Sequence, residues 1–242
     1  MKIKAELIEN PKDSIILSPR KHDNYQAPDF LVGIHRLGIE SELNLFNKNT
    51  CQELDNTPYI GNINHSQALS LNSSLGGFTL FPLELTDVIY RLMQGIGNNE
   101  IIYYSDKTPV PREILQYMLN EMIVVRAPWR GEWLDAEFDN NQITYHKFDS
   151  SGNIIQVTEH LDKDTLMENR SPGISLADYI KNPTSQGLPR KTVKEGEFHY
   201  WHPKNGRVAR LLSDSVRVLL YCNWDSGDAD SSLGVRRSQK IS

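Results

Sequence analysis

The sequence predicts an α+β fold, and three observations lead to that class. Two segments, 87–94 and 113–122, place apolar residues at the spacing of an amphipathic helix. The stretch 133–157 contains two clusters of turn-forming residues, which is typical of an antiparallel meander. Residues 216–222 alternate in the manner of a half-buried strand. We therefore expect short helices, an antiparallel meander and much irregular structure.

Residues 1–74 differ in character from the rest of the chain. They are rich in Asn, Pro and Ser, and their apolar runs are short, at 15–17, 30–32 and 43–45. Such runs favour short strands and loops. We expect an N-terminal extension of unassigned structure that packs on a main domain of residues 75–242 or mediates assembly.

The first helix of the main domain follows a short alternating segment at 78–81, which predicts a strand. Thr86 offers an N-cap hydroxyl, and Gly95 and Gly97 end the helix predicted over 87–94. Four apolar residues would share one face of this helix: Val88, Ile89, Leu92 and Met93.

The second helix starts with Pro111 in its first turn and runs to Met122. The meander follows, with turns predicted at 139–142 and 149–153, where Asn, Asp and Gly tolerate positive φ. Ser175 and Asp178 resemble a capping box that opens a short helix ending near residue 180. The remaining predicted strands lie at 198–201, 216–222 and 233–235, with a turn at 204–206.

Composition excludes several classes of protein. With 242 residues, 38% hydrophobic and 24% charged, the chain can bury an ordinary core. No apolar run approaches the ~20 residues needed to span a bilayer, and the charged N-terminus lacks a secretion signal, so we expect a cytoplasmic or virion-associated protein. The net charge is −5 and Lys and Arg are scattered, which argues against nucleic-acid binding. Two cysteines are too few for a disulfide scaffold or a cysteine-based zinc site.

The segment 209–237 is the most informative part of the sequence. Its strand alternation would turn Val216, Val218, Leu220 and Cys222 to the core. The alternate residues would face outward, and they mix a cation, an aliphatic group, a phenol and an amide: Arg217, Leu219, Tyr221 and Asn223. Trp224 and a polar loop follow. Rigid aromatics among small hydrogen-bonding residues are typical of adaptable recognition surfaces. A hairpin loop covered by one Trp is the simpler alternative, and it stays open.

Several short motifs carry a family resemblance. The segment ends in Leu233-Gly234-Val235-Arg236, and upstream lie Gly77-Phe78-Thr79-Leu80, Glu84-Leu85-Thr86, Gly187-Leu188-Pro189, Tyr200-Trp201 and Arg207-Val208-Ala209-Arg210. In this order they resemble the C-type lectin fold of formylglycine-generating-enzyme-like proteins, and more specifically the variable proteins of diversity-generating retroelements. The resemblance covers residues 75–238 in scattered pieces. Residues 1–74 match nothing in that family.

The resemblance implies that a variable segment at about 209–236 contains two kinds of positions, some that form the scaffold and others that bind the ligand. Scaffold positions would be Val218, Leu220, Cys222, Leu233, Gly234 and Val235. Ligand-binding positions, rewritten by adenine-directed mutagenesis, would be Leu219, Tyr221, Asn223, Trp224, Asp225, Asp228 and Asp230, with Ser215 and Arg217 at the margin. We thus expect a non-catalytic ligand-binding protein of viral or prokaryotic type, whose partner is a protein or a cell-surface molecule. The sequence does not predict whether the protein forms oligomers.

Two other functions compete with recognition. Formylglycine-generating enzymes share the same fold and use a pair of cysteines near the C-terminus. Here Cys222 is alone in that region, and Cys51 lies in the unassigned part. In the strand alternation Cys222 points inward, where cysteine behaves as a small hydrophobe. We therefore predict no enzyme activity, with that oxidoreductase as the alternative. A structural or assembly protein of a virus or mobile element is the third candidate.

We predict no metal site and no cofactor, with calcium as the one alternative. His199 and His202 are three residues apart, but on a strand they would point to opposite sides, so we do not expect them to share a metal. Asp225, Asp228 and Asp230 could gather around calcium, which takes six to eight oxygen ligands. A solvated acidic loop is the simpler account, and calcium stays open as an alternative.

Two further groups of residues favour packing over chemistry. Trp129 and Trp133 could stack on a sugar, but we expect them to anchor the meander against the second helix. Glu132, Asp135 and Glu137 could suggest a glycosidase pair. Nothing else in the sequence builds a cleft around them, so we expect a solvated acidic edge that discourages strand-to-strand aggregation.

Overall fold

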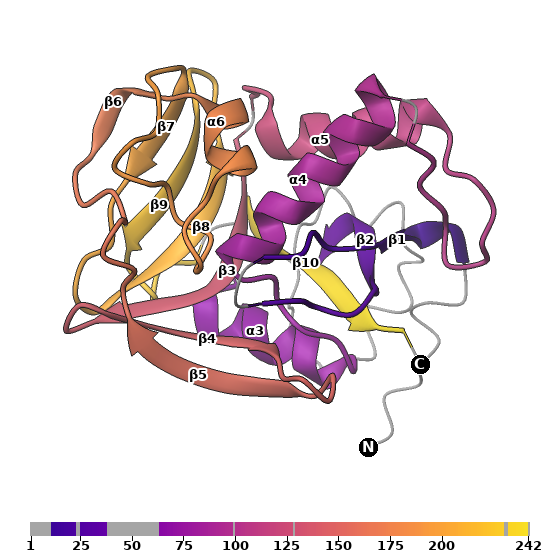
Figure 1. Ribbon diagram of the computed structural model, residues 1–242, viewed down its shortest axis with the longest axis horizontal. Coiled ribbons are helices and arrows are strands. Elements are labelled where there is room, and N and C mark those ends of the chain that lie inside the picture. The colour runs from indigo at the N-terminus through magenta and orange to yellow at the C-terminus, as the bar shows by residue number, and fades with distance from the viewer. Residues whose placement is uncertain are drawn as a thin grey trace.

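A ten-stranded sheet organises the residues that the computed structural model describes, which are 11–22, 25–37, 63–98, 100–127, 129–229 and 232–241 (Figure 1). Its strands follow the order β1-β2-β10-β3-β8-β9-β7-β6, and the β4–β5 hairpin branches from β3. The strands are β1 (Ser14–Leu17), β2 (Phe30–Leu37), β3 (Arg130–Asp139), β4 (Gln142–Phe148), β5 (Ile154–His160), β6 (Arg170–Ile174), β7 (Phe198–Trp201), β8 (Arg207–Ser213), β9 (Val218–Trp224) and β10 (Leu233–Lys240).

Helices cover the sheet from two sides. A short 3-10 turn, η2 (Pro11–Asp13), precedes β1, and the α-helices are α3 (His65–Ser74), α4 (Pro82–Gly97), α5 (Arg112–Ile123) and α6 (Leu176–Lys181). Helix α4 packs against α5 and α6 over the larger core, whereas α3 packs on β10 and β3 over a smaller core. Figure 1 shows β6 to β9 gathered on the left and β1, β2 and β10 on the right. None of the described helices has the length and apolar character to cross a membrane.

The predicted mixture of helices and strands is confirmed, as a large, mostly stranded sheet with few helices. The meander corresponds to β3, β4 and β5, and its turns use positive φ at Asn140, Asn141 and Gly152. Helix α5 matches the predicted second helix. Helix α6 starts at its predicted cap, because the Ser175 side chain accepts a hydrogen bond from the Asp178 backbone.

The start of α4 was predicted wrongly. The helix begins at Pro82 rather than at residue 87, because Pro82 supplies a preorganised first turn and the Glu84 side chain reaches back to the Phe81 N–H, 3.4 Å away. Thr86 lies inside the helix, where its hydroxyl donates to the Leu83 carbonyl oxygen at 2.7 Å. The strand predicted at 78–81 reduces to a single bridge between Phe78 and Ser238.

The described parts of residues 1–74 belong to the same sheet and cores as the rest. Strand β2 pairs with β10, and β1 pairs with β2. The runs predicted at 15–17 and 30–32 are these two strands, and the run at 43–45 lies outside the described residues. Helix α3 was not predicted, because its ten residues show almost no segregation of apolar side chains to one face. Its start depends instead on Asn64, whose side chain accepts from the Gln67 N–H at 3.0 Å.

Candidate recognition surface

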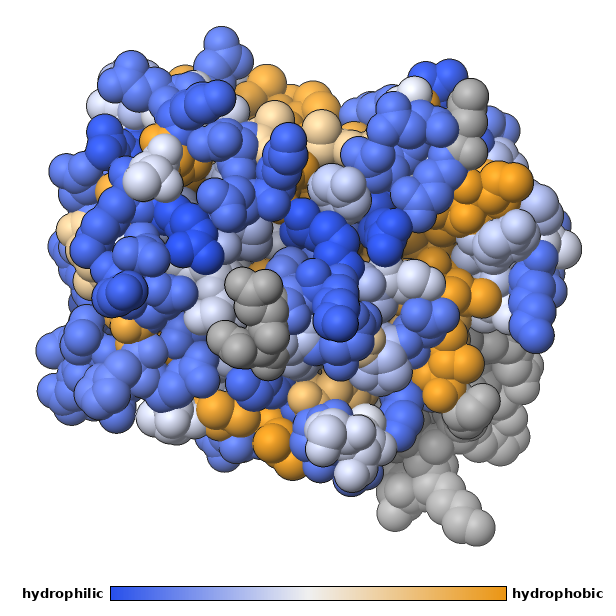
Figure 2. Space-filling model, in the orientation of Figure 1, coloured by the Kyte–Doolittle hydropathy of each residue, from blue (hydrophilic) through white to orange (hydrophobic). Residues whose placement is uncertain are grey.

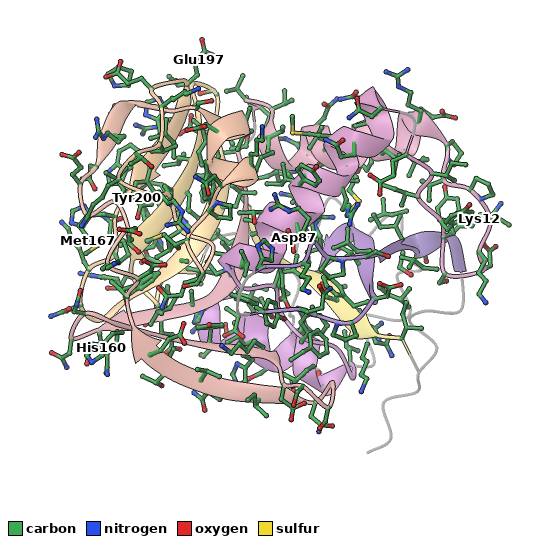
Figure 3. All side chains as sticks on the ribbon, in the orientation of Figure 1. Lys12, Asp87, His160, Met167, Glu197 and Tyr200 are labelled. Carbon is green, nitrogen blue, oxygen red and sulfur yellow. The ribbon has the colours of Figure 1, made fainter. Side chains whose placement is uncertain are left out.

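Strands β7, β9 and β8 lie side by side and turn opposite faces to two different environments. Tyr200 and Leu220 are direct neighbours in the sheet, and both join the larger core. Trp201 is paired with Tyr221, and Tyr221 with Arg210, on the other face. The regular alternation of strands thus separates a packed side from a second side that carries aromatic and cationic groups. Figure 3 labels Tyr200 within this group of strands.

A β-bulge at the end of β9 alters the alternation. Arg210 pairs with Tyr221 and Val208 pairs with Trp224, so that three steps along β9 correspond to two along β8. A bulge leaves one extra residue in one strand and re-aims the side chains that follow. As a result Trp224 lies beside Tyr221, with ring centroids 5.0 Å apart.

Four rings form a continuous line across these strands, which we call the aromatic row: His199, Trp201, Tyr221 and Trp224. The His199 and Trp201 centroids are 5.9 Å apart, and those of Trp201 and Tyr221 are 5.0 Å apart. All four residues are half-buried. Aromatic pairs at such distances stabilise each other by about 0.5–1.5 kcal/mol beyond the area they bury. The row is therefore a surface with a defined shape that retains contact with water.

Arg210 supports the row from within the sheet. Its guanidinium carbon lies 3.4 Å from the Trp224 ring centroid, 5.1 Å from that of Tyr221 and 5.6 Å from that of Trp129. The residue is only 2% exposed. A desolvated cation over aromatic faces stabilises them by up to about 2 kcal/mol. The indole N–H of Trp224 is buried and finds no acceptor among the described residues.

One end of the row meets the turn between β8 and β9. The Asp214 carboxylate accepts hydrogen bonds from the Val216 N–H at 2.8 Å and from the Arg217 N–H at 2.9 Å. Arg217 also lies over the Trp201 ring, 5.3 Å from its centroid. Partial burial acts to raise the pKa of Asp214, but these backbone hydrogen bonds and the Arg217 guanidinium lower it overall. Ser215 is exposed in the same turn.

The opposite end of the row meets the loop between β9 and β10. Asp225 accepts from the Arg207 guanidinium at 2.6 Å and from the Gly227 N–H at 2.9 Å. The hydrogen bond from Gly227, together with Arg207, lowers the pKa of Asp225. Asp228 is exposed, and Asp230 lies outside the described residues. Within the described part of the chain, no group of three or more His, Cys, Asp and Glu side chains could hold a metal ion.

Two positions in the segment differ from the strand prediction. Leu219, expected to face a ligand, is 0% exposed. It lies in an interior strand of the sheet with His199 of β7 and Leu212 of β8 beside it, so its side chain is enclosed by neighbours. Val216, expected in the core, is 80% exposed because β9 begins only at Val218 and Val216 belongs to the turn. The other inward positions, Val218, Leu220 and Cys222, are buried as predicted.

The structure brings together Arg217, Tyr221 and Trp224 from the predicted set, and adds residues that were missed. Asn223 is half-buried beside them. Trp201 and Arg210 were not predicted as part of this surface. The alternation of residues 198–201, with Phe198 and Tyr200 inward, could have identified Trp201. No sequence signal identifies Arg210, because its role depends on the pairing of β8 with β9.

The remaining candidates occupy other environments. The Cys222 thiol is buried, and desolvation raises its pKa well above the usual value. His199 belongs to the aromatic row, whereas His202 contacts the Asn169 side chain at 2.9 Å, so the two histidines are engaged separately. The prediction that Trp129 and Trp133 anchor the meander against the second helix is wrong, because both pack on the smaller core, on the α3 side. The Trp133 indole N–H donates to the Ile63 carbonyl oxygen at 3.0 Å.

The predicted acidic edge is wrong for two of its three members. Glu132 is buried and forms an ion pair with Arg236. Asp135 is buried as well, and its carboxylate accepts from the His146 backbone at 2.8 Å and from the His146 ring at 2.9 Å. Strand β10 thus provides the cation for Glu132 and strand β4 the donors for Asp135, which compensates for burial. Only Glu137 is exposed.

Comparisons with protein-family models, with curated proteins and with solved structures find nothing that matches this chain.

Proposed function

We propose that this protein is a non-catalytic binding protein that recognises a protein or a cell-surface molecule through the aromatic row and its two flanking loops. The observation that carries the proposal is the row itself, in which half-buried rings are held by Arg210 beneath them. Tyr, Trp and Arg dominate the energetics of binding surfaces.

The support beneath the row is the physical reason to expect useful affinity from a small patch. Ordering a rotamer-rich side chain on binding costs about 0.5–1.5 kcal/mol. Ring contacts and the buried guanidinium already limit the motion of Tyr221 and Trp224, so less of that cost remains for the ligand to offset. The exposed Ser215, Asp225 and Asp228 at the two ends add hydrogen-bonding groups around an apolar centre.

We further propose that the scaffold is C-type-lectin-like and that the surface is diversified, as in the variable proteins of diversity-generating retroelements. The separation of roles within one segment supports this. Val218, Leu220 and Cys222 are buried in the larger core, while Tyr221 and Trp224 reach the solvent side a residue or two away. Substitution at the second group changes the surface without opening a cavity.

The alternative, a formylglycine-generating-enzyme-like oxidoreductase, depends on Cys222. Reactive cysteines are partly exposed and have a lowered pKa, because the thiolate is the reacting species. Burial of Cys222 raises its pKa, which disfavours the thiolate. We therefore place this activity second.

Sequencing of many alleles, together with the flanking DNA, tests the proposal. We expect substitutions to concentrate at the exposed and half-buried positions Ser215, Arg217, Tyr221, Asn223, Trp224, Asp225 and Asp228. Val218, Leu219, Leu220 and Cys222 serve as matched controls in the same segment and should stay constant. A reverse-transcriptase gene and a near-copy of the DNA that encodes 209–236 should lie nearby. Substitutions spread evenly over the segment, or the lack of both flanking elements, would refute diversification.

A further inference from the structure

A hollow lies on the side of the sheet that carries the larger core, away from the aromatic row. It is a cavity of about 480 Å³ between residues 21, 22 and 25, the β4–β5 hairpin, the turn at 162–164 and the segment 181–190 at the end of α6 and beyond it. Tyr145 in its lining belongs to the larger core. Among the described residues, five cationic side chains line it, and we call the site the lysine pocket: Lys21, Lys147, Lys163, Lys181 and Arg190.

The three carboxylates of the lysine pocket already have partners within the protein. Asp164 accepts from Arg190 at 3.2 Å. Glu159 accepts from the Tyr145 hydroxyl at 3.0 Å and from the Gln186 side chain at 2.8 Å. Asp162 accepts from the Ser185 hydroxyl at 3.1 Å and from the Asp164 N–H at 2.9 Å. These acids therefore contribute to the structure of the loops and compensate only part of the positive charge.

Three lysines of the pocket remain without such partners. Within the described residues, the ammonium groups of Lys21, Lys163 and Lys181 make no hydrogen bond or ion pair, and Lys147 lies 3.9 Å from Glu159. The chain as a whole has a net charge of −5, so this local excess of cations runs against the overall balance. Several positive charges around a hollow focus the electrostatic field there and attract anions.

The walls of the pocket are held in place from below. Asp87, which is 0% exposed, accepts from Arg20 at 2.6 Å and contacts the His22 ring at 3.1 Å, so that residues 20–22 are tied to α4. Figure 3 shows Asp87 near the middle of the molecule. On the other side, the loop 181–190 approaches α4 so closely that a side chain at Gly187 would meet the Leu83 backbone. Lys21, Lys181 and Arg190 are thus presented from two anchored segments, and Lys147 is held in β4.

We infer that the lysine pocket binds a small molecule that carries phosphate or sulfate groups. Lysine is a point-charge ligand for such oxyanions, and several ammonium groups around one hollow suit more than one negative charge. The volume falls within the range of small-molecule sites and exceeds the space of a single oxyanion. Asn182 also lines the pocket, and its side-chain amide can hydrogen-bond to the neutral part of the ligand. This site is independent of the aromatic row.

Titration calorimetry of the whole chain with inorganic pyrophosphate in low-salt buffer tests the inference. We expect saturable binding that weakens as sodium chloride is added, because exposed charges are screened. The double variant Lys163→Gln/Lys181→Gln should raise the Kd about tenfold. Lys204→Gln removes an exposed lysine outside the pocket and should leave the Kd unchanged. Parallel titrations with orthophosphate and with sulfate, which are single tetrahedral oxyanions of similar size, identify the preferred group by the lower Kd.

Three results would overturn the inference. They are the lack of saturable binding of any of these oxyanions to the wild-type chain, equal Kd values for the wild type and the double variant, and equal weakening by Lys204→Gln. Thermal melts of all variants serve as the folding control. If the double variant melts early, the single variants Lys163→Gln and Lys181→Gln replace it, because each removes only one exposed charge and each should still raise the Kd.

Discussion

At the scale of single residues, Glu84 illustrates how burial changes the pKa of a carboxyl group. It is buried in the first turn of α4 and accepts a hydrogen bond from the Tyr25 hydroxyl at 2.9 Å. Desolvation raises its pKa well above the usual value, and the hydrogen bonds from Tyr25 and Phe81 offset this only in part. The folded chain therefore keeps a proton that the unfolded chain releases above about pH 4.3.

This proton makes stability depend on pH with a definite sign. As pH rises from about 4.3 toward the raised pKa of Glu84, the unfolded state loses its proton first, so the free energy of unfolding falls. Glu84→Gln removes the titration and preserves an acceptor for Tyr25. We expect its stability relative to wild type to be greater at pH 8 than at pH 4, measured by urea unfolding. Glu197→Gln, at an exposed position, is the control; parallel profiles for Glu84→Gln and wild type would contradict the prediction.

Leu219 and Ser215 provide a matched pair within one segment. Leu219 is enclosed in an interior strand, so Leu219→Ala should cost about 2–5 kcal/mol of unfolding free energy through lost burial and a cavity. Ser215 is exposed in a turn, and Ser215→Ala should stay within about 0.5 kcal/mol of wild type. Chemical denaturation of both variants measures the difference. Similar costs at the two sites would mean that Leu219 is not enclosed as described.

At the scale of elements, the sequence predicts structure well where local physics decides it. The turns of the meander require positive φ, and Asn140, Asn141 and Gly152 supply it. The cap of α6 depends on Ser175 and Asp178, which meet in space because they are only three residues apart in the sequence. Such features need no knowledge of the rest of the chain.

The features that the sequence does not predict depend on pairing between strands that are distant in the chain. The bulge that brings Trp224 beside Tyr221 arises from the register of β9 against β8. Burial of Glu132 follows from Arg236, which is far away in the chain and arrives through β10. Part of the candidate surface, Tyr221 and Trp224, could be predicted from composition and alternation, whereas Arg210 and the enclosure of Leu219 follow from tertiary contacts.

Gly187 allows the loop that follows α6 to pack against the start of α4. Gly187 has φ +81°, and an added Cβ would lie 1.9 Å from the Leu83 nitrogen. Gly187→Ala must therefore push the loop off the start of α4, and we expect a loss of more than about 3 kcal/mol or failure to fold.

Gly206→Ala serves as the control, because it introduces backbone strain without a steric clash. Gly206 also has positive φ, at +67°, but has no heavy atom within 4 Å of an added Cβ. Its substitution should cost only the backbone term of about 1 kcal/mol. Melting temperatures of the two variants provide the comparison, and an equal loss in both would show that close approach to Leu83 contributes nothing.

At the scale of the whole molecule, β10 connects the two halves of the sheet. It lies between β2 and β3, and Arg236 within it contacts both neighbours. The Arg236 guanidinium forms an ion pair with Glu132 of β3 and donates to the Gly33 carbonyl oxygen of β2 at 2.9 Å. Arg36 of β2 lies 3.9 Å from Glu132 as well. Buried charge in this region therefore links three strands.

Removal of Glu132 tests that link. Glu132→Gln leaves the buried Arg236 without its carboxylate, and removal of one partner of a buried pair costs about 3–5 kcal/mol. Glu168→Gln breaks the exposed pair with Arg170 and should cost at most about 1 kcal/mol. Guanidinium denaturation of both variants gives the measurement. A neutral Glu132→Gln would mean that the carbonyl partners of Arg236 suffice.

The position of β10 also affects the order of events during synthesis. A ribosome adds about 5–20 residues each second and releases the chain from its N-terminal side. Residues 14–37 emerge early, yet the strand that joins them to β3 is the last of the ten to be made. For roughly 10–40 s the nascent polypeptide therefore exposes the unpaired flank of β2, where a chaperone could shield it from other strands.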